Sequence, residues 1–393
     1  MKRLNDVRVL MYSHDTFGLG HLRRSRAVAH ALVERYKGVT VLIVSGSQIA
    51  GAFDFRARVD FVKIPSVIKL YSGEYASMAE HIDLEDTLHM REGLVRQTAA
   101  TFQPDFFIVD KEPLGLKGEV ERTLRDCRRL GVPTVLGLRD VMDDPVALAH
   151  EWAARDLVSR IDALYDEVWV YGPHNFFDPL EGFTIPPGLA PRIRHTGFLR
   201  RDAPDPDERA RGRILVTAGG GGDGWRVMNA VLDALDADPT LTAPFTLVPG
   251  PFMGTDEREA IHRRTANRGN VDVIDFDANL EGMVASCAGL VGMCGYNTFC
   301  EVLSFDRPAL FMPRTHPRAE QLIRATRAAE LGWSQVLDSD SAADPSRMAA
   351  ALHVLAQGPR PSDASTAPDM SGLRTVCDRV AHLTGRTQLQ AAE

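Results

Sequence analysis

A histidine that follows a glycine turn is the first feature of this sequence that could do chemistry. Gly18-Leu19-Gly20-His21 comes after a short apolar stretch, Val7–Ser13, and before a helical pattern that starts at Leu22. Glycines allow a tight turn and the close approach of a ligand. A histidine in the first helical turn feels the helix dipole, which lowers its pKa and favours the neutral imidazole of a general base. The spacing therefore predicts that His21 is a catalytic base or contacts a substrate.

Other ionisable side chains also follow apolar stretches in the first half of the chain. Asp110-Lys111-Glu112 comes after one such stretch, and Arg139-Asp140 and His174 come after two others. Because the carboxyl ends of parallel strands meet at one edge of a sheet, these groups predict a substrate-facing edge. Asp110 is the second catalytic candidate, as a contact for an acceptor hydroxyl or a second base. Lys111 could instead form a structural ion pair with its neighbours.

Smaller roles are open for the residues around His21. His14 and Asp15 are candidates to orient the imidazole, or they cap the turn. Arg23, Arg24 and Arg26 follow on the same helical pattern, and we expect at least two of these three arginines to be exposed to solvent.

The second half contains two elements suited to an anionic ligand. Arg213–Thr217 runs into the glycine loop Gly219-Gly220-Gly221-Gly222, and Gly289–Val291 leads to Gly295 and a helix that carries Glu301. Backbone N–H groups at such loops and helix starts bind phosphate oxygens. A carboxylate two turns into a helix can accept hydrogen bonds from ribose hydroxyls. The loop lacks the Gly-Lys-Ser/Thr of a P-loop.

Short apolar stretches alternate with helical patterns along all 393 residues, which predicts parallel sheets covered on both faces. Strands are expected at Val7–Ser13, Val39–Ser45, Asp60–Ile64, Phe106–Asp110, Thr134–Leu138, Glu167–Tyr171, Arg213–Thr217, Phe245–Val248, Val271–Ile274, Gly289–Val291, Ala309–Met312 and Ser334–Leu337. The expected helices include Leu22–Tyr36, Lys117–Leu130 and Pro145–Arg160. We predict an α/β protein with two doubly wound domains facing each other across a cleft. The divisions are an N-terminal domain at 1–199, a linker at 200–212, a C-terminal domain at 213–370, and a final helix and tail at 371–393.

Composition narrows the class of protein. A formal net charge of -8 argues against a nucleic-acid partner, which would need a basic excess. Five cysteines without a C-x-x-C pair argue against a disulfide framework or a zinc knuckle and favour a cytoplasmic location. The sequence has no stretch approaching the ~20 apolar residues that span a bilayer, so a lipid-linked substrate would be met at the membrane surface. No Asp-x-Asp pair stands in the expected cleft loops, and we expect neither a catalytic metal nor a cofactor.

These parts, in this order, resemble the two-domain GT-B glycosyltransferases of the family 28 type, which include the N-acetylglucosaminyltransferase of peptidoglycan synthesis. The resemblance implies a nucleoside-diphosphate sugar as partner, UDP-linked and in that enzyme type UDP-GlcNAc, and an unidentified acceptor. It implies ribose binding by Glu301, base contacts by Phe276 and Leu280, and sugar contacts by Gln321, Glu320 and Arg324. The last two stand where the peptidoglycan enzyme has amides. The phosphate-binding set is Gly18, Gly20, Gly219, Gly220, Gly221, Gly295, Tyr296, Asn297 and Thr298.

The predicted reaction is an inverting, metal-independent sugar transfer in which His21 deprotonates the acceptor hydroxyl. A rival interpretation is hydrolysis, because Gly18–Arg24 and an acid behind the glycine loop, Asp223, also resemble nucleotide-sugar hydrolases of pseudaminic acid synthesis. The region Phe53–Phe102, which could supply an acceptor surface, favours transfer. A nonhydrolytic nucleotide-sugar binding protein and a 2-epimerase remain the other interpretations.

Overall fold

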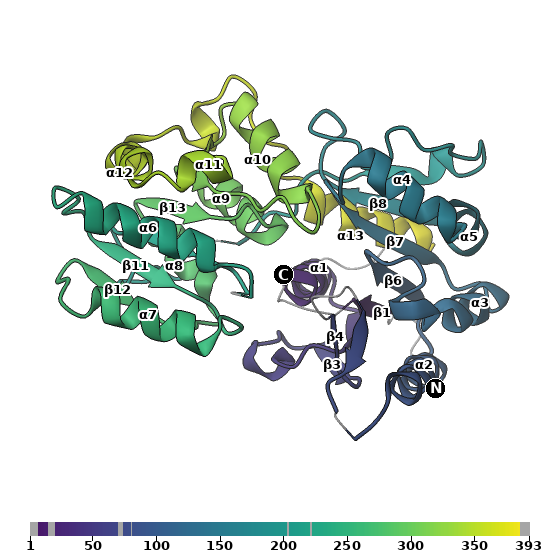
Figure 1. Cartoon of the computed structure of the whole chain (residues 1–393). Helices are drawn as coiled ribbons and strands as arrows, with labels where there is room; N and C mark the ends of the chain where they lie inside the picture. Colours follow the sequence, from purple (N-terminus) through teal and green to yellow (C-terminus); the bar gives the residue numbers. More distant parts are fainter. Residues whose placement is uncertain are drawn as a thin grey trace. The chain divides into compact units, whose positions relative to one another are not determined.

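The chain forms two compact units (Figure 1). The computed structural model describes residues 7–14, 20–69, 74–79, 81–202, 204–220 and 222–385. Asp15, Gly18 and Gly221, which the sequence singled out, lie outside these residues. The first unit is Met1–Leu199 with Ser371–Glu393, and the second is Arg200–Met370. Residues 200–212 are therefore grouped with the second unit, and the last helix with the first.

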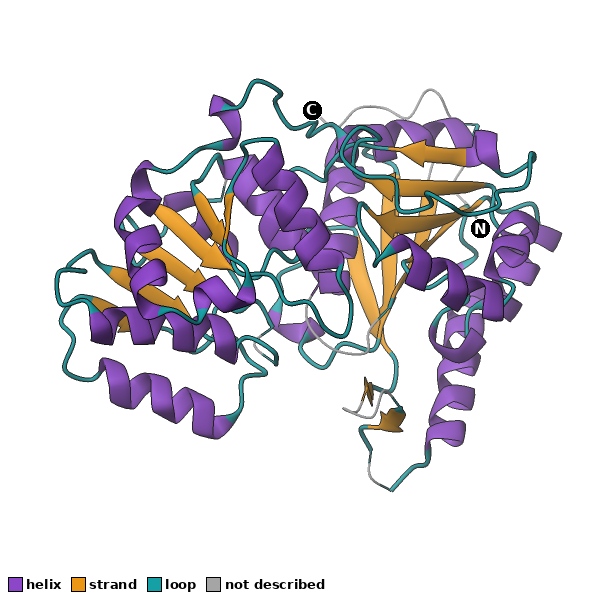
Figure 2. Ribbon diagram, turned by 45° about the horizontal axis from the view of Figure 1, so that its top comes forward, coloured by secondary structure: helices purple, strands orange, loops and turns teal. Residues whose placement is uncertain are grey.

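The first unit is built on a parallel sheet whose described strands run in the order β3-β2-β1-β6-β7-β8-β9. Their bounds are β1 Val7–Ser13, β2 Val39–Ser45, β3 Val59–Lys63, β6 Phe106–Asp110, β7 Thr134–Arg139, β8 Glu167–Tyr171 and β9 Ile193–His195. The central strands β6 and β8 are buried along their whole length, because helices cover both faces of the sheet (Figure 2). The predicted strands of this half are confirmed within one residue, whereas β9 was not predicted.

The α-helices described in this unit are α1 Gly20–Arg35, α2 Leu84–Phe102, α3 Glu121–Arg129, α4 Pro145–Ala154, α5 Leu157–Leu164 and α13 Gly372–Leu383. The unit also contains a small antiparallel pair of strands, β4 Val67–Lys69 and β5 Tyr75–Ser77. The single helix expected at Pro145–Arg160 is wrong, because Asp156 has a positive φ of 49° and separates α4 from α5. The helix expected from Lys117 starts only at Glu121, because Lys117 and Gly118 also have positive φ angles.

The final helix, α13, is part of the first unit through specific contacts. It packs against α1, and the Tyr36 hydroxyl after α1 donates to the carbonyl of Cys377. Arg379 of α13 forms an ion pair with Glu167, the first residue of β8. Gly372 fits because a Cβ there would lie 2.4 Å from the Gly197 carbonyl oxygen.

The second unit contains a second parallel sheet, with its described strands in the order β12-β11-β10-β13-β14-β15. The strands are β10 Ile214–Thr217, β11 Phe245–Val248, β12 Val271–Val273, β13 Gly289–Gly292, β14 Ala309–Phe311 and β15 Gln335–Val336. The helices are α6 Trp225–Ala237, α7 Thr255–Thr265, α8 Leu280–Ser286, α9 Tyr296–Phe305, α10 Glu320–Glu330, α11 Ser339–Ala342 and α12 Pro345–Val354. The predicted strands are again confirmed, with ends that differ by one residue, while α11 and α12 were not predicted.

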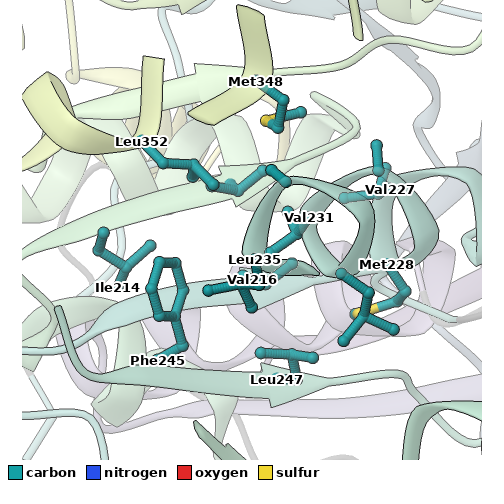
Figure 3. Packing of buried hydrophobic residues seen from close by; sticks show 14 of the residues in the cluster. Ile214, Val216, Val227, Met228, Val231, Leu235, Phe245, Leu247, Met348 and Leu352 are labelled. Atoms are coloured by element: carbon teal, nitrogen blue, oxygen red, sulfur yellow. The ribbon is translucent and has the colours of Figure 1, made fainter. Parts of the chain in front are cut away.

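One apolar core of the second unit lies between its sheet and two helices (Figure 3). Val227, Val231 and Leu235 of α6 pack with Val216 of β10 and with Phe245 of β11. The spacing of i, i+4 and i+8 on α6 places these three side chains on one helical face. Met348 and Leu352 of α12 complete the layer.

Both sheets therefore have the doubly wound form that the sequence predicted. In each, the strand order reverses at one point, between β1 and β6 in the first unit and between β10 and β13 in the second. Ligands of open parallel sheets bind outside the carboxyl ends of the strands at such switch points. In the described part of the chain, no helix is both long and apolar enough to cross a membrane.

Candidate functional site

The switch point of the first unit brings together the two residues proposed for catalysis. His21 lies in the first turn of α1, which follows β1, and Asp110 is the last residue of β6. Since β1 and β6 are neighbours, the turn after one strand meets the end of the other. Residues 89 positions apart in the sequence are thus adjacent in space.

The geometry is that of a histidine–carboxylate pair held by an arginine. His21 Nδ1 lies 2.5 Å from Asp110 Oδ2. Arg24 donates two hydrogen bonds to the same carboxylate, from Nε to Oδ1 at 2.8 Å and from Nη2 to Oδ2 at 2.6 Å. The Asp110 side chain is 3% exposed and that of Arg24 is 2% exposed, whereas that of His21 is 15% exposed. The imidazole is therefore the member of the three that a ligand can reach.

The electrostatics assign the protonation states. Burial alone would raise the pKa of Asp110, but Arg24 and the hydrogen bond from His21 hold it well below its usual value. Burial lowers the pKa of His21 to about 4, against the raising effect of Asp110. The direction agrees with the sequence prediction, although burial is the main cause. An ionised carboxylate only accepts hydrogen bonds, so we assign the proton to Nδ1, which leaves the lone pair on Nε2.

The surroundings of this pair are buried. The ring of His14 lies edge-on to that of His21, with 5.3 Å between centroids, and burial lowers the pKa of His14 as well. Tyr171, the last residue of β8, is buried, and Asp110 adds to the burial that raises its pKa. Tyr171 is accommodated by Gly137 in β7, where a Cβ would lie 2.2 Å from the tyrosine hydroxyl.

The charged residues next to His21 and Asp110 differ in part from what the sequence predicted. The expectation that at least two of the three α1 arginines are solvated is wrong, because Arg23 and Arg24 are buried. Arg24 is the residue of this candidate site that sequence reasoning missed. Its spacing of three from His21, which places both on one helical face, was the available signal. Lys111 does pair with Glu112 at 3.4 Å, as the structural interpretation allowed.

In the second unit, the glycine loop follows β10 at the other switch point. Gly219 has a φ of 62°, and its N–H lies 3.2 Å from Thr217 Oγ1, which accepts from it. Gly220 accepts a hydrogen bond from the N–H of Phe252. Gly250 packs so closely on this loop that a Cβ there would lie 2.5 Å from the Gly219 carbonyl oxygen. The described part of the loop is therefore tightly packed rather than free.

The start of α9 follows β13, the strand beside β10. Gly295 is its N-cap residue and makes no side-chain cap, while Tyr296, Asn297 and Thr298 of the first turn are buried. The amide oxygen of Asn297 accepts a hydrogen bond from Arg201 at 2.8 Å. The helix start thus lies at the switch point, where its N–H groups and dipole suit an anion.

Strain is present in the residue just before this helix. Cys294 has a φ of 67°, a conformation that costs a residue other than glycine roughly 1–2 kcal/mol. Its thiol is buried, as expected, and its carbonyl accepts a hydrogen bond from Arg324 Nη1 at 3.0 Å. Strained backbone that the surroundings hold in place is common at ligand sites.

The candidates for ribose, base and sugar binding occupy different environments. Glu301 lies on α9 with 0% exposure, so contact with a ribose would require its surroundings to open. Phe276 is half-buried, and Leu280 is the buried first residue of α8. Gln321 accepts the N–H of Arg314 through its side-chain oxygen.

Arg314 is the second residue that sequence reasoning missed. It donates to Asp223, behind the glycine loop, at 2.9 Å and to the buried Glu320 at 2.6 Å. It therefore connects the loop after β10 with the start of α10. No pattern in the sequence pairs Arg314 with an acid 91 residues away. Arg324, also on α10, is fully buried above the ring of Tyr296, 5.7 Å from its centroid.

Comparison with solved structures identifies the fold. The glycotransferase of kitacinnamycin matches with a TM-score of 0.61 and 18% identity over 99% of this chain and 100% of its own. A UDP-N-acetylglucosamine 2-epimerase matches with a TM-score of 0.61 and 14% identity over 98% of both chains. MurG of Acinetobacter baumannii matches with a TM-score of 0.54 and 14% identity over 98% of this chain and 96% of its own. The chain has the GT-B fold.

The match extends over both units, so the predicted fold class is confirmed for the whole chain. Neither a family model nor a curated protein sequence matches the chain. By name, the GT-B neighbours include a glycotransferase and an epimerase. The fold therefore does not decide the reaction, which depends on the side chains of each unit.

Proposed function

We propose that the protein is an inverting glycosyltransferase that moves a sugar from a nucleoside-diphosphate sugar, UDP-linked by resemblance, to an acceptor hydroxyl. The observation that carries this proposal is the His21–Asp110 pair at 2.5 Å, fixed by Arg24 at the switch point of the first sheet. It provides a neutral imidazole with an available Nε2, which is what deprotonation of a hydroxyl needs.

In the proposed reaction, His21 Nε2 accepts the proton as the acceptor oxygen attacks the anomeric carbon. The bond between that carbon and the diphosphate oxygen breaks, and the nucleoside diphosphate leaves. Asp110 stabilises the imidazolium that forms, and Arg24 keeps Asp110 ionised and in position. His21 acts directly on the substrate, whereas Arg24 is a positioning residue.

For the second unit, we propose donor binding. The start of α9 at Gly295–Thr298 would bind the diphosphate through N–H groups and the helix dipole, and would stabilise the charge of the leaving group. Glu301 would accept hydrogen bonds from the ribose. Gln321 and the Arg314–Glu320 pair would contact the sugar, and Phe276 and Leu280 the base.

Metal independence is part of the proposal. The N–H groups and the helix dipole at the start of α9 would stabilise the charge of the leaving diphosphate, which a metal ion would otherwise neutralise. The rate after treatment with a chelator is expected to equal the untreated rate. A requirement for added Mg²⁺ or Mn²⁺ would contradict this part.

The test begins with the donor. Nucleoside diphosphates and nucleotide sugars are screened by thermal shift, where a ligand at 100 times its dissociation constant stabilises the binding state by about 2.7 kcal/mol. The donor so identified is then supplied with a labelled sugar, with and without a pool of hydroxyl-bearing acceptors. Label on an acceptor supports transfer, and free labelled sugar at the same rate without acceptor supports hydrolysis instead.

The role of His21 is tested in the same assay. His21→Ala should lose about 10²–10⁴-fold in turnover while its affinity for the nucleoside diphosphate is unchanged. His30→Ala, which removes a half-buried histidine of the same helix, is the matched control and should keep its activity. Equal turnover of His21→Ala and wild type would remove His21 from the mechanism.

A further inference from the structure

A second group of chemically capable side chains lies at another part of the first unit. His174 and Asp178 belong to the long segment Gly172–Arg192 that leaves β8, and His195 is the last residue of β9. Strand β8 pairs with β9 in parallel, with Val170 opposite His195, so the end of β9 lies beside the start of this segment. The three residues lie within one stretch of 22 residues, 174–195, and their potential metal-binding atoms lie close together.

The donor atoms are close enough to share an ion. One ligand atom from each of His174, Asp178 and His195 lies within 4.8 Å of the other two. His174 Nδ1 and His195 Nε2 are 3.3 Å apart. A tetrahedral zinc site with bonds of about 2.0–2.2 Å has neighbouring ligands about 3.3–3.5 Å apart. The two nitrogens already have this spacing, and a carboxylate oxygen of Asp178 lies within 4.8 Å of both.

The spacing of the nitrogens suits an ion better than a direct hydrogen bond. Hydrogen bonds donated by N–H groups are commonly about 2.9–3.0 Å long, and the two imidazoles are farther apart, with ring planes inclined by 69°. Two of the three potential metal ligands are also held in place by the surrounding structure. His195 belongs to a strand, and Asp178 Oδ1 accepts a hydrogen bond from the N–H of Leu180.

The donor set also suits the charge of the ion. Imidazole binds a metal through a ring nitrogen that carries no proton, and the carboxylate of Asp178 would partly neutralise a divalent cation.

We propose that His174, Asp178 and His195 bind one divalent transition-metal ion of the Zn²⁺ type. Two imidazole nitrogens and one carboxylate are a donor set that Zn²⁺, Co²⁺ and Ni²⁺ accept, whereas Mg²⁺ and Ca²⁺ prefer oxygen ligands. Three protein ligands leave room for water to complete the coordination. The ion would join the segment after β8 to the end of β9.

This site is separate from the His21–Asp110 pair. In the first sheet, β9 is three strands away from β6, which at about 4.8 Å per strand is roughly 14 Å. The metal proposal therefore does not rest on the proposed function. It concerns the anchoring of Gly172–Arg192 and of His195, which directly precedes the residues Thr196–Leu199 that end the first part of this unit.

The experiment uses the full chain without an affinity tag, freed of metal with a chelator. Zn²⁺ is titrated into the wild type and into His174→Ala, Asp178→Ala and His195→Ala, and bound metal is measured after gel filtration. His150→Ala, an exposed histidine on α4 of the same unit, is the matched control. Co²⁺ is used in parallel, because its visible absorption band reports the coordinating atoms.

The expected result is one Zn²⁺ per chain for the wild type and His150→Ala. Each ligand variant should bind about 100-fold or more weakly, since even indirect supports of a metal ligand are worth 10–100-fold. His174 is exposed, so His174→Ala keeps the fold even if His195→Ala does not, and far-UV circular dichroism checks this. Absence of Zn²⁺ binding by the wild type, or equal affinity in the wild type and His174→Ala, would overturn the proposal.

Discussion

Removal of Arg24 should change the base strength of His21 in a direction that can be measured without any substrate. Arg24 Nη2 lies 3.0 Å from His21 Nδ1, and its charge lowers the pKa of His21. For charges about 4 Å apart at an effective dielectric constant of about 20, the repulsion is about 4 kcal/mol. Because burial is the larger cause of the low pKa and that burial remains, the full repulsion is an upper limit, and Arg24→Met should raise the pKa of His21 above about 4 while recovering only part of the shift.

The assay is deuterium exchange at the imidazole C2 carbon, which depends on protonation and is followed by mass spectrometry. Trypsin leaves His14 and His21 in one peptide, so fragmentation in the spectrometer must separate them. Arg24→Lys is informative as a second variant. It keeps the positive charge but loses the two-pronged contact with Asp110, so the pKa of His21 should stay low.

Breaking a buried ion pair costs about 3–5 kcal/mol, so each variant must be shown to be folded at each pH. Arg26→Met is the control, because Arg26 lies on the same helix but contacts the Asp54 carbonyl and the ring of Phe53. Its His21 should titrate as in the wild type. A folded Arg24→Met protein whose His21 still titrates near 4 would refute the electrostatic account of the site.

Three other substitutions test the packing and the donor site. Arg91→Met should destabilise the first unit by about 3–5 kcal/mol in urea unfolding, because Arg91 is fully buried and forms an ion pair with the buried Glu119. Arg129→Met is the control, because the ion pair of Arg129 with Asp126 is exposed and its loss should cost under about 1 kcal/mol. Gly137→Ala should cost about 1–3 kcal/mol and lower activity, because the new methyl group would displace Tyr171, and an unchanged melting temperature would contradict this packing. Glu301→Ala should weaken all ribonucleotides together in calorimetric titration, and equal affinities would exclude the ribose assignment.

The strands could be predicted because of where they lie. Phe106–Asp110 and Glu167–Tyr171 are buried on both faces, so they appear in the sequence as continuous apolar stretches with sharp ends. The three-residue strand Ile193–His195 lies at the edge of the sheet and contains an exposed arginine, so it lacks that signal. The break at Asp156 was missed because an isolated positive φ at an aspartate has no sequence periodicity.

The site was predictable in its parts but not in its connections. His21 and Asp110 stood out because each follows a strand, yet only the strand order, with β1 beside β6, shows that they touch. Arg24 appeared to be a surface residue because arginines usually are. Its burial is a tertiary effect that depends on the carboxylate of Asp110. The cluster of His174, Asp178 and His195 depends on β9, which the sequence did not reveal.

The arrangement around Asp110 affects both the availability of the base and its strength. In a histidine–carboxylate pair without a cation, the carboxylate raises the pKa of the imidazole, and part of the protein becomes inactive by protonation near neutral pH. Here Arg24 uses both oxygens of Asp110, so the carboxylate still orients Nδ1 but attracts a proton to His21 less strongly. With a pKa of about 4, only about one molecule in a thousand holds a protonated His21 at pH 7. The cost is a weaker proton acceptor, so the proposed reaction depends on a leaving group that is already well stabilised. The proposed nucleoside diphosphate, held at a helix N-terminus, would meet that requirement, so such a base suits the proposed class of donor.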